Sequence, residues 1–181
     1  YGIRKAAVEA FLLDEARRGF PATILHPGHI TGPGWNPINP AGNLDSTVFD
    51  RLARGDPVNL PDDGNATLQH VHADDVALAF QLALEQPQQA IGEAFHVAAL
   101  EPVTLRDYAE SAASWFGLRA NLAFLPWDEW TMTVSDTDAA LTRDHVIHSP
   151  HASISKARER LGFSPQYTAA EAARDAVMSR R

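Results

Sequence analysis

The sequence contains no cysteine and no long apolar run, and each absence excludes a class of protein. Without thiols there can be no disulfide bridge and no thiolate metal site. No stretch of about 18 apolar residues is present, so the sequence predicts no transmembrane helix. No signal peptide opens the chain either, and we expect a cytoplasmic protein.

Basic residues are also in the minority. The 181 residues include 15 Lys and Arg against 23 Asp and Glu, a formal net charge of -8. Such a surface disfavours nucleic acid or an anionic membrane as the main partner and leaves a small molecule as the expected one. The hydrophobic fraction of 45% is that of an ordinary globular domain with a core of its own.

The chain opens with a predicted helix over residues 1–20. Its apolar positions recur at roughly helical spacing: Ile3, Val8, Phe11, Leu12 and Phe20. Tyr1 and Lys5 are four residues apart and therefore share one helix face. An ammonium group beside a phenol favours the phenolate and lowers the phenol pKa, so such a Tyr can exchange a proton with a substrate hydroxyl or carbonyl.

The pattern Y-x-x-x-K occurs often by chance, and the segments that follow it are what favour a functional Tyr/Lys pair here. An apolar strand predicted over 22–26 follows the helix, and then a Gly- and Pro-rich segment, Pro27-Gly28-His29-Ile30-Thr31-Gly32-Pro33-Gly34. This order resembles the second half of the extended short-chain dehydrogenases/reductases, the NAD(P)-dependent epimerases, dehydratases and related reductases. The segment 155–165 resembles the closing S-K-A-R-x-x-L-G-F-x-P of the same family.

The resemblance implies an α/β fold, the C-terminal part of a Rossmann-like doubly wound parallel sheet with a small α/β substrate-binding region. It assigns 1–34 and 74–98 to the nicotinamide side, and 35–73 and 99–181 to the substrate side. The G-x-G-x-x-G fingerprint of dinucleotide binding is missing, so we interpret the chain as a C-terminal fragment. One edge of the strand at 22–26 should then have unpaired backbone groups.

The resemblance also implies roles for individual residues. Tyr1 would be the general acid/base, and Lys5 would lower its pKa and bind the nicotinamide ribose of NAD or NADP. The turn Pro27, Gly28, His29 and Ile30 would lie along the nicotinamide, although a tight turn that only redirects the chain is the alternative. The implied enzyme acts on a hydroxyl or carbonyl substrate, and a homodimer is compatible with it. The alternative function is a non-catalytic dinucleotide sensor or an RNA-associated relative, and the acidic charge speaks against RNA.

Candidate substrate residues lie in the predicted loop over 27–45. Trp35 could stack on a polyhydroxylated ligand, and Asn36, Asn39 and Asn43 could hydrogen-bond to it. Equally, Asn and Pro are simply turn formers here. Beyond the loop, Leu68 replaces the Arg that binds the diphosphate in many nucleotide-sugar enzymes, which makes a nucleotide-sugar substrate doubtful.

Histidines form two further patterns. His70 and His72 face the same way on a strand predicted over 68–72, and two Asp follow, but no further ligands are suitably spaced for a metal. We therefore expect no metal, with Asp74 and Asp75 as helix caps and His70 as a substrate contact. His145, His148 and His151 repeat every three residues up to the break at Pro150, which favours surface histidines near a substrate mouth.

Overall fold

The computed structural model describes residues 2–180. Its helices are α1 (Gly2–Arg17), α2 (Thr47–Arg54), α3 (Ala73–Glu85), α4 (Pro87–Ala90), α5 (Leu105–Ser114), α6 (Trp127–Thr131), α7 (Asp136–Val146), α8 (Ser155–Leu161) and α9 (Ala169–Met178). Its strands are β1 (Ile24–Pro27), β2 (His29–Thr31), β3 (Val58–Pro61), β4 (Thr67–Leu68), β5 (His70–His72), β6 (Ala94–Val97), β7 (Val103–Thr104) and β8 (Leu122–Leu125).

The strands pair two by two, and most pairs are parallel. β1 pairs with β6, β2 with β5 and β3 with β8 in parallel, whereas β4 and β7 are antiparallel. Parallel neighbours need long crossovers, and helices supply them here, so the predicted α/β class is confirmed. Within residues 2–180, β1 pairs on one side only, as expected for the strand at 22–26.

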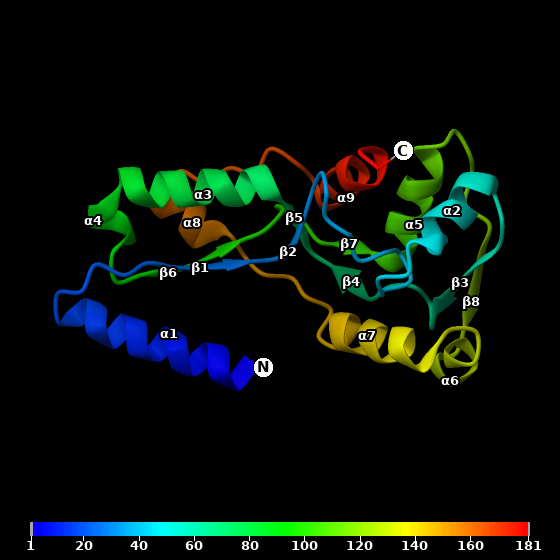
Figure 1. Cartoon of the computed structure of the whole chain (residues 1–181), viewed down its shortest axis with the longest axis horizontal. Helices are drawn as coiled ribbons and strands as arrows, with labels where there is room; N and C mark the ends of the chain where they lie inside the picture. Colours follow the sequence, from blue (N-terminus) through cyan, green and yellow to red (C-terminus); the bar gives the residue numbers. More distant parts are fainter. Residues whose placement is uncertain (1, 181) are drawn as a thin grey trace.

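Two hydrophobic clusters hold these elements together. The larger is formed by α2, α5 and the β3–β8 pair and includes Leu60, Leu105, Tyr108 and Trp130. The second lies between the β1–β6 pair and helices α3 and α8, with Phe95 and Phe163 at its centre. Figure 1 shows α3 and α8 on one face of β1 and β6, with α1 on the opposite face; α2, α5, β3 and β8 lie at the far end of the molecule. The domain boundaries inferred from the sequence stay a prediction.

Helix α1 differs from the others because none of its described side chains is buried. Ile3 is 89% exposed and Phe11 63% exposed, so the apolar positions found by spacing do not pack into a core formed by residues 2–180. The helix ends two residues before Gly19, which has a positive φ of 101°. No helix in the described part of the chain is long and apolar enough to cross a membrane.

Three predicted boundaries were wrong. The loop predicted over 27–45 contains β2, and the strand predicted over 68–72 is two strands, because β4 pairs with β7 whereas β5 pairs with β2. The sequence also predicts one helix over 127–141, but the structure interrupts it between α6 and α7, where Ser135 starts a new helix by accepting a hydrogen bond from the Asp138 N–H. Short strands of this kind depend on partners distant in the sequence, and local pattern does not reveal them.

Helix ends were predicted more accurately. The order Thr168-Ala169-Ala170-Glu171 predicts a capping box, and Thr168 and Glu171 form it at the start of α9. Thr104, three residues before Asp107, is likewise predicted to open a helix, and it caps α5 by accepting from the Asp107 N–H. The cap of α3 was assigned wrongly. His72, not Asp74, is the N-cap, and its Nδ1 accepts from the Asp74 N–H at 3.1 Å.

Candidate cofactor and substrate site

A groove of about 860 Å³ runs between α1 and the chain that leaves β1. Its lining brings together most of the residues selected from the sequence: Lys5, Pro27, Gly28, His29, Ile30, Trp35 and Asn36. Val8, Leu12 and Leu25 add an apolar wall. This volume is within the range of small-molecule sites. Tyr1, the predicted acid/base, lies outside the described residues.

The turn at Gly28 is built by backbone contacts with two neighbouring strands. The Gly28 N–H donates to the Val97 carbonyl at 2.8 Å, and the His29 N–H donates to the Gln69 carbonyl at 3.1 Å. A Cβ at position 28 would lie 2.5 Å from that Gln69 oxygen. Glycine is therefore required for the chain to pass from β1 to β2, whichever ligand lies beside it.

A second cavity of about 1090 Å³ opens on the other side of His29. The same turn, with Glu9 and His26, lines both cavities. Asp144 and His145, at the end of α7, lie on the wall of the second cavity. The turn after β1 is thus a partition that two ligand groups could approach from opposite sides.

Three histidines from distant parts of the chain meet at this partition. The His29 ring is 5.5 Å from His70 and 5.9 Å from His145, both centroid to centroid and edge-on. His70 in turn contacts Tyr108, whose hydroxyl donates to the Ile38 carbonyl at 3.0 Å. The β2–β5 pairing places His29 directly opposite His70, which explains why the two rings touch.

Burial keeps the inner histidines neutral. It lowers the pKa of His29 to about 4, together with a smaller contribution from His145. Burial lowers the pKa of His70 to about 3, with a smaller contribution from His29. The Ile38 carbonyl lies near enough to oppose this pKa shift, yet neither ring nitrogen of His70 completes a hydrogen bond within residues 2–180.

His70 was predicted to contact substrate. The structure places it behind His29 with no exposed surface, so a ligand would reach it only if His29 moved. Its neighbour His72 is equally enclosed, and its Nε2 lies 3.1 Å from the Asp175 carboxylate. Asp75 was expected to cap the helix, but its carboxylate accepts instead from the Gln166 and Tyr167 N–H groups and so ties down the loop before α9. Among the described residues, no group of His, Asp and Glu could hold a metal ion.

The asparagines of the loop after β2 have mostly internal partners. Asn39 is buried and donates to the Asn43 side chain and, at 2.9 Å, to the Asp45 carbonyl. Asn43 donates to Thr142 on α7 at 3.2 Å. Asn36 donates to the Leu44 carbonyl and accepts from Arg180. These contacts are those of turn formers, the alternative left open by the sequence, and a substrate role for the three asparagines stays a prediction.

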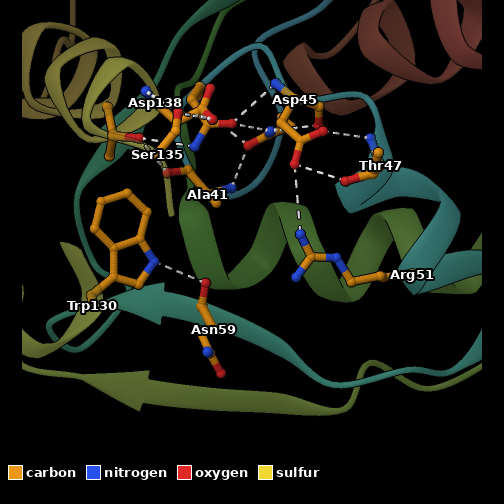
Figure 2. A network of polar contacts seen from close by, with 11 residues as sticks. Ala41, Asp45, Thr47, Arg51, Asn59, Trp130, Ser135 and Asp138 are labelled. Atoms are coloured by element: carbon orange, nitrogen blue, oxygen red, sulfur yellow. Dashed lines mark hydrogen bonds and ion pairs between the residues drawn. The ribbon is translucent and has the colours of Figure 1, made fainter. Parts of the chain in front are cut away.

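The same loop is anchored to α2 and α7. Figure 2 shows the Asp45 carboxylate accepting from Thr47 and facing Arg51 at 3.6 Å. It also shows Trp130 donating its indole N–H to the Asn59 carbonyl at 3.1 Å. Asp45 thus fixes the end of the loop on α2, and the Thr142 hydroxyl, which donates to the Ala41 carbonyl at 2.9 Å, fixes the loop on α7, the helix that bears His145.

Asp144 was not predicted as a site residue from the sequence, and His145 was predicted only as a surface histidine near a substrate mouth. The histidine repeat in the sequence points to this region, but it does not show which of the three histidines lines the cavity. His145 donates from Nδ1 to the Gly42 carbonyl at 2.7 Å and lines the cavity, whereas His148 and His151 are exposed. Only the packing of α7 against the loop distinguishes them.

The sequence pattern described as "NAD dependent epimerase/dehydratase family" matches residues 1–98, more than half of the chain. The chain belongs to this family. The match includes Tyr1, helix α1 with Lys5, and the turn after β1. No curated protein is significantly similar to the chain.

Solved structures of this family share the fold. UDP-glucose 4-epimerase from Thermotoga maritima is 25% identical with a TM-score of 0.66, and the match covers 100% of this chain and 53% of that protein. UDP-N-acetylglucosamine 4-epimerase from Bacillus cereus is 22% identical with a TM-score of 0.71, covering 100% and 54%. UDP-glucuronic acid 4-epimerase from Bacillus cereus, solved with NAD, is 20% identical with a TM-score of 0.60, covering 88% and 44%. The chain therefore spans about half the length of these epimerases or less.

Proposed function

We propose that the protein is an NAD(P)-dependent enzyme that oxidises, reduces or epimerises a hydroxyl- or carbonyl-bearing small molecule. The observation that carries the proposal is the groove between α1 and β1, around which Lys5 and the turn from Pro27 to Ile30 converge. The family match over residues 1–98 supports it, because it includes both segments. The sugar nucleotides bound by related epimerases make a sugar a reasonable substrate class.

The residues around the groove fit a nicotinamide nucleoside. The aliphatic side chains of Val8, Leu12 and Leu25 suit the face of a flat ring, and the Lys5 ammonium suits ribose hydroxyls. When bound, the cofactor would supply or accept the hydride. Turn residues Pro27, Gly28, His29 and Ile30 would hold the ring, and Lys5 would hold the ribose.

Tyr1 would move the proton. Its phenol, four residues before Lys5 in the sequence, would take a proton from a substrate hydroxyl during oxidation and return one to the carbonyl during reduction. The Lys5 ammonium would favour the phenolate and so bring Tyr1 into a useful range at neutral pH. Trp35 and Asn36, at the open end of the same groove, are the proposed substrate contacts.

Two substitutions in the full protein test these roles. Tyr1→Phe should reduce turnover by roughly two orders of magnitude or more while leaving NAD and NADP affinity nearly unchanged, because only the proton-carrying hydroxyl is lost. Lys5→Ala should weaken cofactor binding and also slow turnover. The control is Arg4→Ala, on the same exposed helix but outside the groove lining.

Steady-state kinetics with sugars and simple carbonyl compounds, together with calorimetric titration of NAD and NADP, give the readouts. Retained turnover in Tyr1→Phe would remove Tyr1 from the mechanism. Tight cofactor binding without turnover on any substrate would favour the sensor alternative.

A further inference from the structure

His145 has no role in the chemistry proposed above, and His29 has a role there only as part of the turn beside the nicotinamide, although both side chains line the 1090 Å³ cavity. Their rings contact each other across it at 5.9 Å between centroids. His29 comes from the turn after β1 and His145 from the end of α7. The two rings therefore meet only because these distant segments pack against each other. The cavity shares the turn with the proposed cofactor groove, and a ligand in it would lie next to the nicotinamide.

The hydrogen bonding of His145 fixes what its free nitrogen can do. Its Nδ1 lies 2.7 Å from the Gly42 carbonyl oxygen. A carbonyl only accepts, so Nδ1 has the proton and neutral His145 presents a lone pair at Nε2. A ligand group at Nε2 must therefore donate a hydrogen bond. An ionised carboxylate cannot do so, and a phosphate can do so only through a P–OH group that it retains.

The surroundings of His29 disfavour a charged ligand as well. Its side chain makes no hydrogen bond to residues 2–180, so its nitrogens are available to a ligand. Behind it lies fully buried His70, itself without a hydrogen-bond partner in the described part of the chain, and then Tyr108, whose hydroxyl is already engaged with Ile38. Protonation of His29 is strongly disfavoured by burial, since its pKa is lowered to about 4.

The charged residues around the cavity also favour an uncharged ligand over an anion. Its acidic lining residues are Glu9, Glu93 and Asp144. Among the described lining residues the one Lys or Arg is Lys156, and its ammonium is 2.8 Å from the Glu93 carboxylate. An anion would thus meet three carboxylates and one ammonium group that already pairs with Glu93. A hydroxyl both donates and accepts, and it satisfies both rings at ordinary hydrogen-bond distances of about 2.8 Å.

We propose that His29 and His145 together bind a hydroxyl of an uncharged, polyhydroxylated part of the substrate, which donates to His145 Nε2 and accepts from a ring N–H of His29. This inference rests on the proposed function, because it assigns the substrate class of that site. His70 acts as a positioning residue, which packs edge-on against His29 and holds its ring at the cavity wall.

Binding can be measured without turnover, which separates this inference from the proposed enzyme activity. The full protein with isotope-labelled histidine is titrated with glucose, galactose and mannose as neutral probes, and with acetate and inorganic phosphate as anions. We expect at least one sugar to shift the ring signals of His29 and His145 saturably, and neither anion to do so. Calorimetry in two buffers of different ionisation enthalpy should show no proton uptake on sugar binding.

Matched variants complete the test. His29→Phe and His145→Phe should each weaken sugar binding at least tenfold, whereas His148→Phe, an exposed member of the same histidine repeat, should not change it. Thermal unfolding of each variant shows whether it folds, and either of the two variants suffices. Saturable anion binding with proton uptake, absence of sugar binding, or unchanged sugar affinity in a folded variant would each overturn the proposal.

Discussion

Helices α1 and α9 lie at opposite ends of the chain and are stabilised very differently. Helix α9 has a capping box and buries Ala172, Ala173 and Ala176 completely. Helix α1 is longer, has no buried side chain, and exposes Ile3 and Phe11. Both contain regularly spaced apolar residues, so spacing alone did not decide burial. What decides it is whether another element covers that helix face.

The regions that stabilise the fold also differ from those that contain the residues proposed for catalysis. The best-packed part of the chain, around α5 and α9, contains none of the residues proposed for hydride or proton transfer. The proposed acid/base helix is the least packed. Residues at functional sites often lie on such less stable elements. Substitutions in the two regions should therefore affect different measurements.

The largest effect is expected in the core beside α9. Leu105→Ala removes a fully buried side chain from the larger cluster and should lower the free energy of unfolding by about 2–5 kcal/mol. Chemical denaturation with circular dichroism measures it. A loss below about 1 kcal/mol would mean that this cluster is not the main source of stability.

Lowering the pH should decrease the free energy of unfolding, because the folded protein keeps His29 and His70 neutral. The pKa of His29 is lowered to about 4 and that of His70 to about 3, below the value near 6.5 of an unfolded chain. Between these values the unfolded state binds more protons, so the stability present above about pH 6.5 is lost as pH falls, at about 1.4 kcal/mol per pH unit for each histidine.

His70→Phe should remove one of these contributions and flatten the decline of unfolding free energy between pH 6.5 and 4. The matched control is His148→Phe, whose ring is exposed. Denaturation curves at several pH values measure both. Identical pH profiles for wild type and His70→Phe would contradict the buried neutral state of His70.

A smaller effect is expected at the start of α9. Thr168→Ala removes the hydroxyl that accepts from the Glu171 N–H and should cost about 1 kcal/mol. Thr168→Ser keeps an oxygen at the same place and serves as the control. Equal losses for Ala and Ser would show that the methyl group matters and the cap does not.

The smallest effect is expected on α1. Phe11→Ala changes an exposed side chain and should alter the free energy of unfolding by less than about 0.5 kcal/mol. Denaturation measured at two protein concentrations tests this. A loss above 1 kcal/mol would show that Phe11 is covered in solution by something other than residues 2–180.

Several features of this protein could be predicted from the sequence, because they depend on residues close together in the chain or on the order of its segments. Thr168 with Glu171, Thr104 and Gly162 mark helix ends because a cap needs only neighbours within a few residues. Tyr1, Lys5 and the turn at Gly28 could be selected because their order along the chain is a family pattern. The parallel α/β arrangement followed from strands alternating with helices.

The tertiary structure decided what local pattern could not. Strand β2 exists because His29–Thr31 finds a partner about 40 residues later, and Leu68 and His70 belong to different sheets for the same reason. The meeting of His29, His70 and His145 depends on the same pairing and on the docking of α7 against the loop at Gly42. Contacts between distant segments are formed only when the whole core closes. Helix α1, none of whose described side chains is buried, is therefore the part whose burial the sequence could least predict.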